Sequence, residues 1–125
     1  MTLVVGNHLF IRLDLSNGKH IGPGKIALLE AIRAEGSILA ASRQFGMSYR
    51  HAWILVREIN RTLGKPAVAT TRARGGGAEL TPVGEEIVEV YRRIEALAYT
   101  STRQELRAMA RLMRRKKGSA SKRIG

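Results

Sequence analysis

The chain has 125 residues, enough for one small domain with an extension, and carries a formal net charge of +12. Residues 111–125 contain seven lysines and arginines and no acid. This excess favours a polyanionic partner, nucleic acid before membrane, although a basic tail can also serve solubility alone. The lack of cysteine excludes disulfides and thiolate metal sites, and no apolar run approaches the roughly 20 residues that cross a bilayer. We expect a cytoplasmic, nucleoid-associated protein without a membrane segment.

Residues 1–21 are expected to contain a short β-hairpin. Alternating apolar residues at positions 9–15 predict a half-buried strand, and residues 19–21 would form the returning strand. Between them, Asn17-Gly18 is a strong signal for a tight turn. Gly22-Pro23-Gly24 is then expected to end the hairpin and to interrupt regular structure.

Three helix-sized segments follow, each closed by a glycine. They span residues 25–35, 37–45 and 48–63, and only Gly46-Met47 separates the second from the third. Serine begins the second and third segments, where its hydroxyl can cap a helix. Two helices joined by so short a turn are typical of a helix-turn-helix. The residues of the second helix that are expected to be buried are Ile38, Ala41 and Phe45.

The third helix places apolar and basic residues on opposite faces. At about 100° per residue, Arg50, Arg57 and Arg61 share one side, whereas the core side carries Ala52, Leu55, Val56, Ile59 and Leu63. Arginine can donate two hydrogen bonds to guanine or neutralise a phosphate, although an ordinary solvated face is the alternative. Trp53 is expected to pack on the first helix, with a contact to DNA sugar or phosphate as the alternative. The helix end that usually contacts bases carries Ser48, Tyr49, Arg50 and His51.

A basic, glycine-rich hairpin is expected after the third helix. Residues 68–71 and 78–80 predict two antiparallel strands. Glycine at the tip permits close approach to a phosphate, and arginine there can contact the backbone or the minor groove; a floppy turn is the alternative. Lys25 and Lys65 are further candidates for phosphate contacts, or are simply solvated. The tip residues proposed to bind DNA are Arg72, Arg74, Gly75 and Gly76.

A long helix is expected to begin at Thr81-Pro82, because threonine is a good cap and proline suits the first helical position. Residues 99–102 weaken this helix, and a capping box over 102–105 would restart it. We therefore expect dimerisation helices over residues 82–113 and a disordered basic tail over 114–125. The apolar positions recur every three or four residues, as in a seam between helices, and are Ile87, Val90, Tyr91, Ile94, Leu97 and Ala98.

No set of residues predicts catalysis, a cofactor or a metal. Gly22-Pro23-Gly24-Lys25 is only superficially like a phosphate-binding loop, because its first glycine is missing and Ile26 replaces the serine or threonine. The three histidines, His8, His20 and His51, lack metal-ligand spacing. We expect a protein that is not an enzyme.

Several segments together resemble the DNA-binding domain of the ModE-type, molybdate-responsive transcriptional regulators. They are residues 22–32, 35–38, 46–53 (Gly-Met-Ser-Tyr-Arg-His-Ala-Trp) and 74–84, together with Asn60. The resemblance covers about residues 22–95. It implies a LysR-like winged helix, a homodimer joined through the long helices and a palindromic operator. Full-length members continue into molybdate-binding domains built from β-strands; helix and basic tail follow here, so we expect a stand-alone form in which molybdate binding is doubtful.

The sequence thus predicts a mainly α protein with small β elements: a winged helix-turn-helix over residues 22–84, a short N-terminal hairpin and a long C-terminal dimerisation helix. The expected function is sequence-specific regulation of transcription by a homodimer on double-stranded DNA, with molybdenum-related genes as candidate targets. A nucleoid-type architectural protein of low specificity is the first alternative. A protein-interaction module is the second, and RNA binding is a weak third, because no strand face carries a pair of stacking aromatics.

Overall fold

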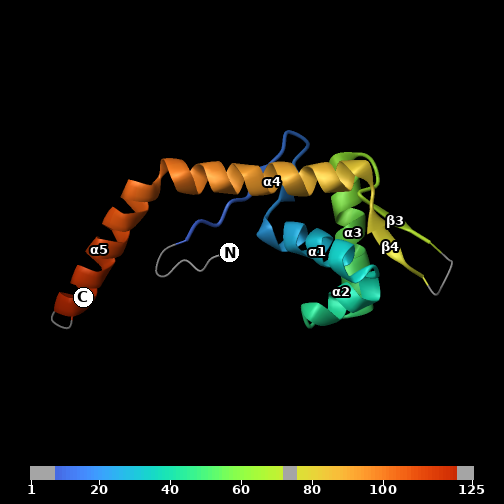
Figure 1. Ribbon diagram of the computed structural model, residues 1–125, viewed down its shortest axis with the longest axis horizontal. Helices are drawn as coiled ribbons and strands as arrows, with labels where there is room; N and C mark the ends of the chain where they lie inside the picture. The colour runs from blue at the N-terminus through green and yellow to red at the C-terminus, as the bar shows by residue number, and fades with distance from the viewer. Residues whose placement is uncertain (1–7, 72–75, 121–125) are drawn as a thin grey trace. The chain divides into compact units, whose positions relative to one another are not determined.

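The computed structural model describes residues 8–71 and 76–120, with side chains described as far as residue 114. Within these ranges it contains five helices and four short strands in the order β1-β2-α1-α2-α3-β3-β4-α4-α5 (Figure 1). The chain divides into two compact units, one of residues 11–92 and one of residues 1–10 and 93–125. The first unit is larger than the predicted domain of residues 22–84, because it includes the β1–β2 hairpin and residues 85–92 of α4.

The hairpin is present but shorter than expected. Strand β1 (Leu13–Asp14) pairs antiparallel with β2 (His20–Ile21), so the expected strand over residues 9–15 shrinks to the two residues for which β2 offers partners. The turn depends on Gly18, whose φ of +83° suits glycine. Asn17 supports the turn from inside by accepting a hydrogen bond from the Lys19 backbone N–H at 3.0 Å.

Helix α1 (Pro23–Glu35) begins earlier than predicted. The prediction that Gly22-Pro23-Gly24 lies outside regular structure was right for Gly22, the extended N-cap, but wrong for Pro23 and Gly24. Pro23 occupies the first helical turn, where its fixed φ is favourable and its missing N–H costs nothing. Gly36 ends the helix in the left-handed conformation with φ +76°. The helix supplies much of the core of this unit through Ile26, Leu28, Leu29, Ala31 and Ile32.

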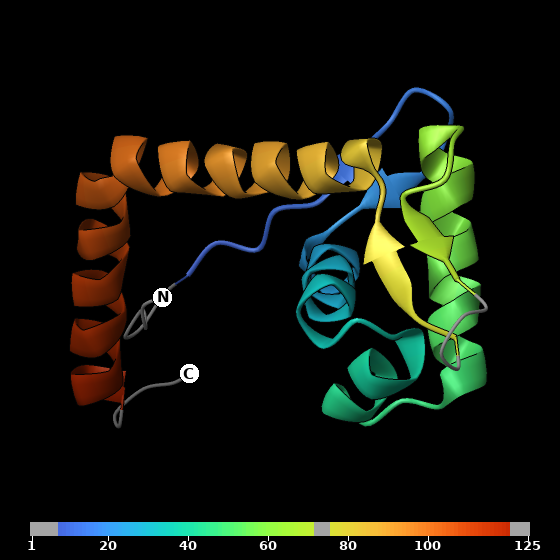
Figure 2. The ribbon, with the colours of Figure 1, turned by 45° about the vertical axis from the view of Figure 1, so that its right-hand side comes forward.

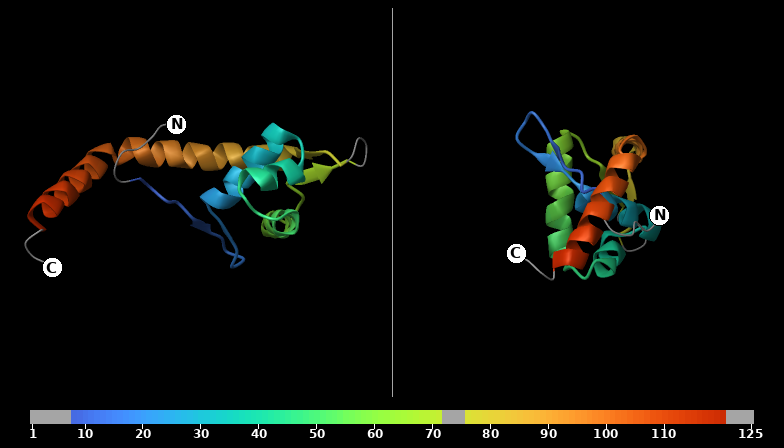
Figure 3. Two further views of the ribbon diagram at one scale, coloured as in Figure 1. Left: turned by 90° about the horizontal axis from the view of Figure 1, so that it is seen from below. Right: turned by 90° about the vertical axis from the view of Figure 1, so that its left-hand side faces the viewer.

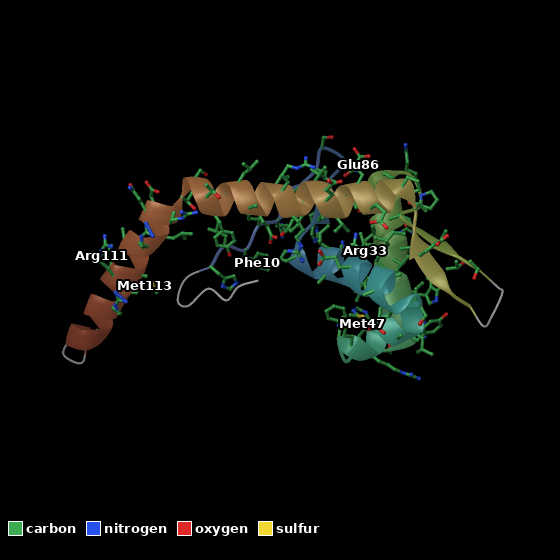
Figure 4. All side chains as sticks on the ribbon, in the orientation of Figure 1. Phe10, Arg33, Met47, Glu86, Arg111 and Met113 are labelled. Atoms are coloured by element: carbon green, nitrogen blue, oxygen red, sulfur yellow. The ribbon has the colours of Figure 1, made fainter. Side chains whose placement is uncertain are left out.

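Helices α2 (Ile38–Gln44) and α3 (Tyr49–Leu63) form the expected helix-turn-helix. Ser37 and Ser48 cap them as predicted, accepting from the backbone N–H groups three residues later at 2.9 and 3.0 Å. Burial of Phe45 was wrongly predicted: its side chain is 43% exposed, because α2 ends one residue earlier and the chain turns away there. Met47, in the turn, is partly buried against the core instead (Figure 4).

The wing is a two-stranded antiparallel sheet of β3 (Val68–Thr70) and β4 (Ala78–Leu80), with Val68 opposite Leu80 (Figure 2). At the end of the strands nearest the wing tip, the Ala78 backbone N–H donates a hydrogen bond to the Gly36 carbonyl at 2.9 Å, which ties the wing to the helices. Because Gly36 directly follows α1 and precedes α2, this bond holds the wing against the helix-turn-helix.

Helix α4 (Pro82–Ser101) begins with Thr81 as its cap, as predicted. The Thr81 hydroxyl accepts from the Gly84 N–H at 3.1 Å and donates to the Pro66 carbonyl at 2.8 Å. The Thr81 N–H donates to the Ala67 carbonyl at 2.9 Å, and Gly84 is buried against the same carbonyl. The start of α4 is therefore held on the segment that links α3 to β3.

The placement of Tyr91 in a dimer seam was wrong. Its side chain is 1% exposed within a single copy of the chain, and its hydroxyl donates to the Ile11 carbonyl at 2.7 Å. Tyr91 belongs to the core of residues 11–92, because the segment before β1 covers the position that α4 alone would leave open. This partner lies 80 residues away in sequence, so helical periodicity cannot reveal it.

In the second unit, α4 ends and α5 (Arg103–Ala120) follows after Thr102. The expected weakness of the helix over 99–102 is seen at Thr102 alone, since residues 99–101 are helical, and the Thr102 hydroxyl donates back to the Ala98 carbonyl at 2.6 Å. Disorder throughout residues 114–125 was wrongly predicted, since α5 continues to Ala120 and only 121–125 lie outside the described residues. Residues 103–117 contain only good helix formers, with no glycine or proline to end the helix earlier.

Candidate nucleic-acid interface

Helix α3 separates a basic outer face from an apolar inner one (Figure 3, left, where α3 is seen nearly along its axis). Arg50, Arg57 and Arg61 are exposed, and the structure assigns their guanidinium groups no hydrogen bond or ion pair within the described residues. The fully buried positions are Ala52, Val56, Ile59 and Thr62, with Leu55 and Leu63 partly buried. The hydroxyl of Thr62 is satisfied by the Glu58 carbonyl at 2.8 Å.

The N-terminal end of α3 is capped by a serine and carries an aromatic pair. Ser48 Oγ is occupied as the helix cap, so this side chain positions the end of the helix. The exposed ring of Tyr49 meets Trp53 edge-on, with ring centroids 6.3 Å apart. Trp53 itself is partly buried against the core, so the Tyr49 ring packs against a side chain that the core holds in place. Beside them, Arg50 and His51 are exposed to solvent.

The wing lies partly outside the described residues. Arg72, Arg74 and Gly75 fall in the gap at 72–75, whereas Gly76 is exposed with a φ of +87°. The Thr71 N–H donates to the Gly77 carbonyl at 2.9 Å and extends the pairing of β3 and β4 toward the tip. The structure thus describes the paired strands of the wing up to Thr71 and Gly77. The contacts proposed between the wing tip and DNA stay a prediction.

Several carboxylates of residues 11–92 are paired with basic side chains other than the arginines of α3. Glu58 is the one acid of α3, and its Oε1 lies 3.4 Å from Lys25 Nζ. Arg33 binds Glu85 at 2.7 Å, joining α1 to α4. Arg92 donates two hydrogen bonds to Glu30, at 2.7 and 3.0 Å, and these lower the pKa of Glu30 against the opposing effect of partial burial. The arginines of α3 are left as positive charges facing solvent.

Two shallow hollows flank the C-terminal half of α3. One, of about 440 Å³, is lined by Arg57, Asn60, Arg61, Gly64, Lys65 and Pro66. The other, of about 260 Å³, is lined by Gly18, Lys19, His20, Lys25, Glu58, Arg61 and Thr62. Sequence reasoning missed the second hollow, because its members come from β2 and its turn, α1 and α3 and share no motif. Arg61 lies between the two hollows.

Neither a metal site nor a membrane segment is found in the part of the chain that the structure describes. No group of three or more histidine, cysteine, aspartate or glutamate side chains within residues 8–71 and 76–120 is placed to bind a metal ion. Over the same ranges, no helix combines the length and the apolar composition that a membrane span needs.

No protein-family model matches the chain. Among curated proteins, it is 44% identical over 81 residues to the molybdenum-pterin-binding protein MopB of Rhodobacter capsulatus, which covers 63% of this chain and 30% of MopB. It is 38% identical over 85 residues to the molybdenum transport protein ModE of Azotobacter vinelandii, covering 66% and 32%. It is 33% identical over 85 residues to the DNA-binding transcriptional dual regulator ModE of Escherichia coli K12, again covering 66% and 32%.

The N-terminal two thirds of the chain are homologous to the ModE-type regulators. The resemblance inferred from the motifs is thereby confirmed. The chain spans about a third of the length of these curated relatives. None of the three is named as an enzyme, in keeping with the expectation for this ModE-like chain.

Solved structures confirm the fold class. The DNA-binding domain of CbnR in complex with DNA matches with a TM-score of 0.56 at 23% identity, covering 69% of this chain and 95% of that domain. ArgP from Mycobacterium tuberculosis matches with a TM-score of 0.50 at 18% identity, covering 68% of this chain and 30% of ArgP. The ModE-like chain thus has the winged helix-turn-helix fold of LysR-type regulators, mainly helical with small antiparallel sheets.

Proposed function

We propose that this ModE-like chain is a sequence-specific, DNA-binding regulator of transcription. The observation that carries the proposal is the arginine face of α3, which has no ion pair within the described residues and lies opposite a mainly apolar inner face, in a fold that CbnR uses in a complex with DNA. The exposed arginines can reach guanine edges or phosphates without first breaking an ion pair within the described residues. Such a protein would work in the cytoplasm, at the nucleoid.

Within this function the residues divide by position. Arg50 and Tyr49, at the N-terminal end of α3, would contact base edges in the major groove, with His51 beside them. Ser48 would act by capping the helix and orienting that end. Arg57 and Arg61 would bind the backbone. The wing residues proposed for backbone or minor-groove contacts are Arg72, Arg74, Gly75 and Gly76.

A homodimer is part of the proposal. Leu97 is 63% exposed on α4, and Met109, Leu112 and Met113 are exposed on α5. Apolar side chains repeated along two helices are costly in water and are typical of a surface covered by a partner. The seam proposed on α4 comprises Ile87, Val90, Ile94, Leu97 and Ala98.

Two-fold symmetry would then present the α3 helices to half-sites on one face of a palindromic operator, about one helical turn or a multiple apart. Molybdenum-related genes are the proposed targets, because the curated relatives are named for molybdenum transport and binding. The proposal includes neither molybdate as a ligand nor a cofactor.

A fluorescence-anisotropy titration at ~150 mM salt tests the function. One duplex carries the region upstream of the chain's own gene, and the control is a scrambled duplex of equal length and composition. A regulator is expected to prefer its site by ~10³ or more. Equal and strongly salt-dependent binding to many such duplexes would favour the architectural alternative. The observation that supports this alternative is the set of exposed arginines on α5, which are Arg103, Arg107, Arg111 and Arg114.

Light scattering after gel filtration tests the homodimer. Leu97→Glu is expected to give a monomer, because a charge would enter the proposed seam, while Ala96→Glu adds the same charge at the adjacent exposed position and should stay dimeric. Equal masses for the two variants and the parent chain would show that Leu97 is not part of a dimer interface.

A further inference from the structure

The hollow of about 260 Å³ beside α3 lies outside the helix-turn-helix and the wing. It is bounded by the turn and second strand of the β1–β2 hairpin, by the first turn of α1 and by the C-terminal half of α3. Figure 3 (right) shows the hairpin beside α3. Three elements from separate parts of the sequence therefore converge on one small site within residues 11–92.

Two contacts hold the hairpin in place over α3. Ile21, on β2, is 1% exposed and anchors the strand in the core. At the turn, Asn17 Nδ2 donates to the Thr62 carbonyl near the end of α3 at 3.3 Å. Lys19 and His20 lie between these anchors and are themselves exposed, so the hairpin presents them at the rim of the hollow.

The charge of the hollow is positive. Lys19, Lys25 and Arg61 bring three positive charges, and Glu58 brings one negative charge. The Lys25 side chain is only 14% exposed, and its Nζ lies 3.4 Å from both Glu58 Oε1 and the His20 carbonyl. Both contacts are long for hydrogen bonds, and an ammonium has three protons to donate. Cations gathered around one weakly engaged lysine favour an incoming anion.

We propose that this hollow binds a backbone phosphate of the DNA duplex, which makes the β1–β2 hairpin a third DNA-contacting element beside α3 and the wing. The inference rests on the proposed function. The main observation for the inference is the position of Arg61, because this residue belongs both to the outer face of α3 and to the hollow. A phosphate next to DNA that is already docked on α3 would therefore meet Lys19 and His20 as well.

The open geometry favours a phosphate of DNA over a free oxyanion. Lys19, His20 and Arg61 are exposed, and solvent screens such charges, so a free anion would bind weakly. A phosphate that belongs to a bound duplex is present at high effective concentration and needs little affinity of its own. Glu58 cancels only one of the three positive charges of Lys19, Lys25 and Arg61, so the hollow keeps a positive balance.

The test combines a substitution in the full chain with neutral replacements of single phosphates in the DNA. Each backbone phosphate of the preferred duplex is replaced in turn by a methylphosphonate, and affinities are measured for the parent chain and for Lys19→Met. The matched control is Arg12→Met, which removes one charge from the same hairpin outside the hollow, where Arg12 is paired with exposed Asp14.

Lys19→Met is expected to weaken binding about five-fold at ~150 mM salt and to reduce the slope of log affinity against log salt by about 0.9, the value for one phosphate. One methylphosphonate should weaken the parent chain but not Lys19→Met, because that contact is already lost. Arg12→Met should behave as the parent at every position.

An unchanged salt slope in Lys19→Met, on a duplex that the parent chain still binds, would overturn the inference and leave the proposed function standing. Equal losses in Lys19→Met and Arg12→Met at every phosphate would do the same. A parent chain that binds no DNA would overturn both. A titration with sodium phosphate at constant ionic strength, followed by NMR, tests whether the ligand is instead a free oxyanion. Chemical-shift changes at Lys19 and Lys25 that saturate at sub-millimolar phosphate, with no methylphosphonate position affecting the parent chain and Lys19→Met differently, would assign the hollow to a free oxyanion and overturn the inference.

Discussion

Gly84→Ala tests how α4 is attached to the rest of its unit. A Cβ at this position would overlap the Ala67 carbonyl oxygen and lie 3.0 Å from the carbonyl carbon. Ala67 is held by both of its backbone polar groups, because its carbonyl accepts from the Thr81 N–H at 2.9 Å and its N–H donates to Asn60 Oδ1 at 2.8 Å. The methyl group can fit only if the segment between α3 and β3 shifts and stretches these bonds.

The loss of unfolding free energy expected for Gly84→Ala has three contributions. Overpacking against a fixed backbone costs about 1–3 kcal/mol, and a weakened hydrogen bond adds about 1 kcal/mol. Replacing glycine by alanine in a helix returns up to about 1 kcal/mol. The net destabilisation is then about 2 kcal/mol, which lowers the melting midpoint by roughly 8 °C for a chain of this size.

Gly24→Ala is the matched control, since Gly24 also lies in the first turn of a helix and no described atom lies within 4 Å of its added Cβ. This variant should be as stable as the parent chain or gain about 0.5 kcal/mol. Urea and thermal unfolding followed by circular dichroism compare the two. Equal stability of Gly84→Ala and Gly24→Ala would refute the argument that the Ala67 carbonyl requires glycine.

Three further predictions follow from the site and its surroundings. Arg50→Ala is expected to cost about 1–3 kcal/mol on the preferred duplex and little on a scrambled one, measured by competition titration; intact discrimination would place base contacts elsewhere. Deletion of residues 114–125, which include six lysines and arginines, should weaken binding to all duplexes alike and flatten the salt dependence, whereas a loss confined to one duplex would speak against a non-specific role. Arg92 lowers the pKa of Glu30 from the ordinary 4.5, so this carboxylate stabilises the fold above about pH 4.5, and the contribution is lost as the pH falls through the lowered pKa. Glu30→Gln should therefore remove roughly 0.5 kcal/mol at pH 7 and progressively less as the pH falls in urea titrations, and an equal loss at neutral and at acidic pH would show that the ion pair is not its cause.

Local signals in the sequence predicted most of the secondary structure. Ser37 and Ser48 cap helices, Gly36 and Gly64 end them, and Thr81 begins α4, as expected. These signals work because a cap involves only residues within one turn of the helix. The start of α1 was missed although it is local, because proline and glycine are compatible both with a loop and with a first helical turn.

Errors about burial have a different origin. Phe45 and Tyr91 were both assigned from helical periodicity, which states only that residues share a side of a helix. Phe45 is exposed because α2 ends before it, and Tyr91 is buried because Ile11, far away in sequence, lies against it. Burial depends on which other elements cover a face, and the period of one helix contains no such information.

The amino-acid sequence by itself determined the helix-turn-helix, the wing strands and the arginine face of α3, since periodicity, caps and turns act over a few residues. Only the tertiary structure decided which charges meet. It brought Lys19 and His20 of the hairpin to Lys25 of α1 and Arg61 of α3, and it placed Gly84 against Ala67. Such neighbours are selected by the packing of a shared core, whose energy depends on all the elements together and not on any one segment.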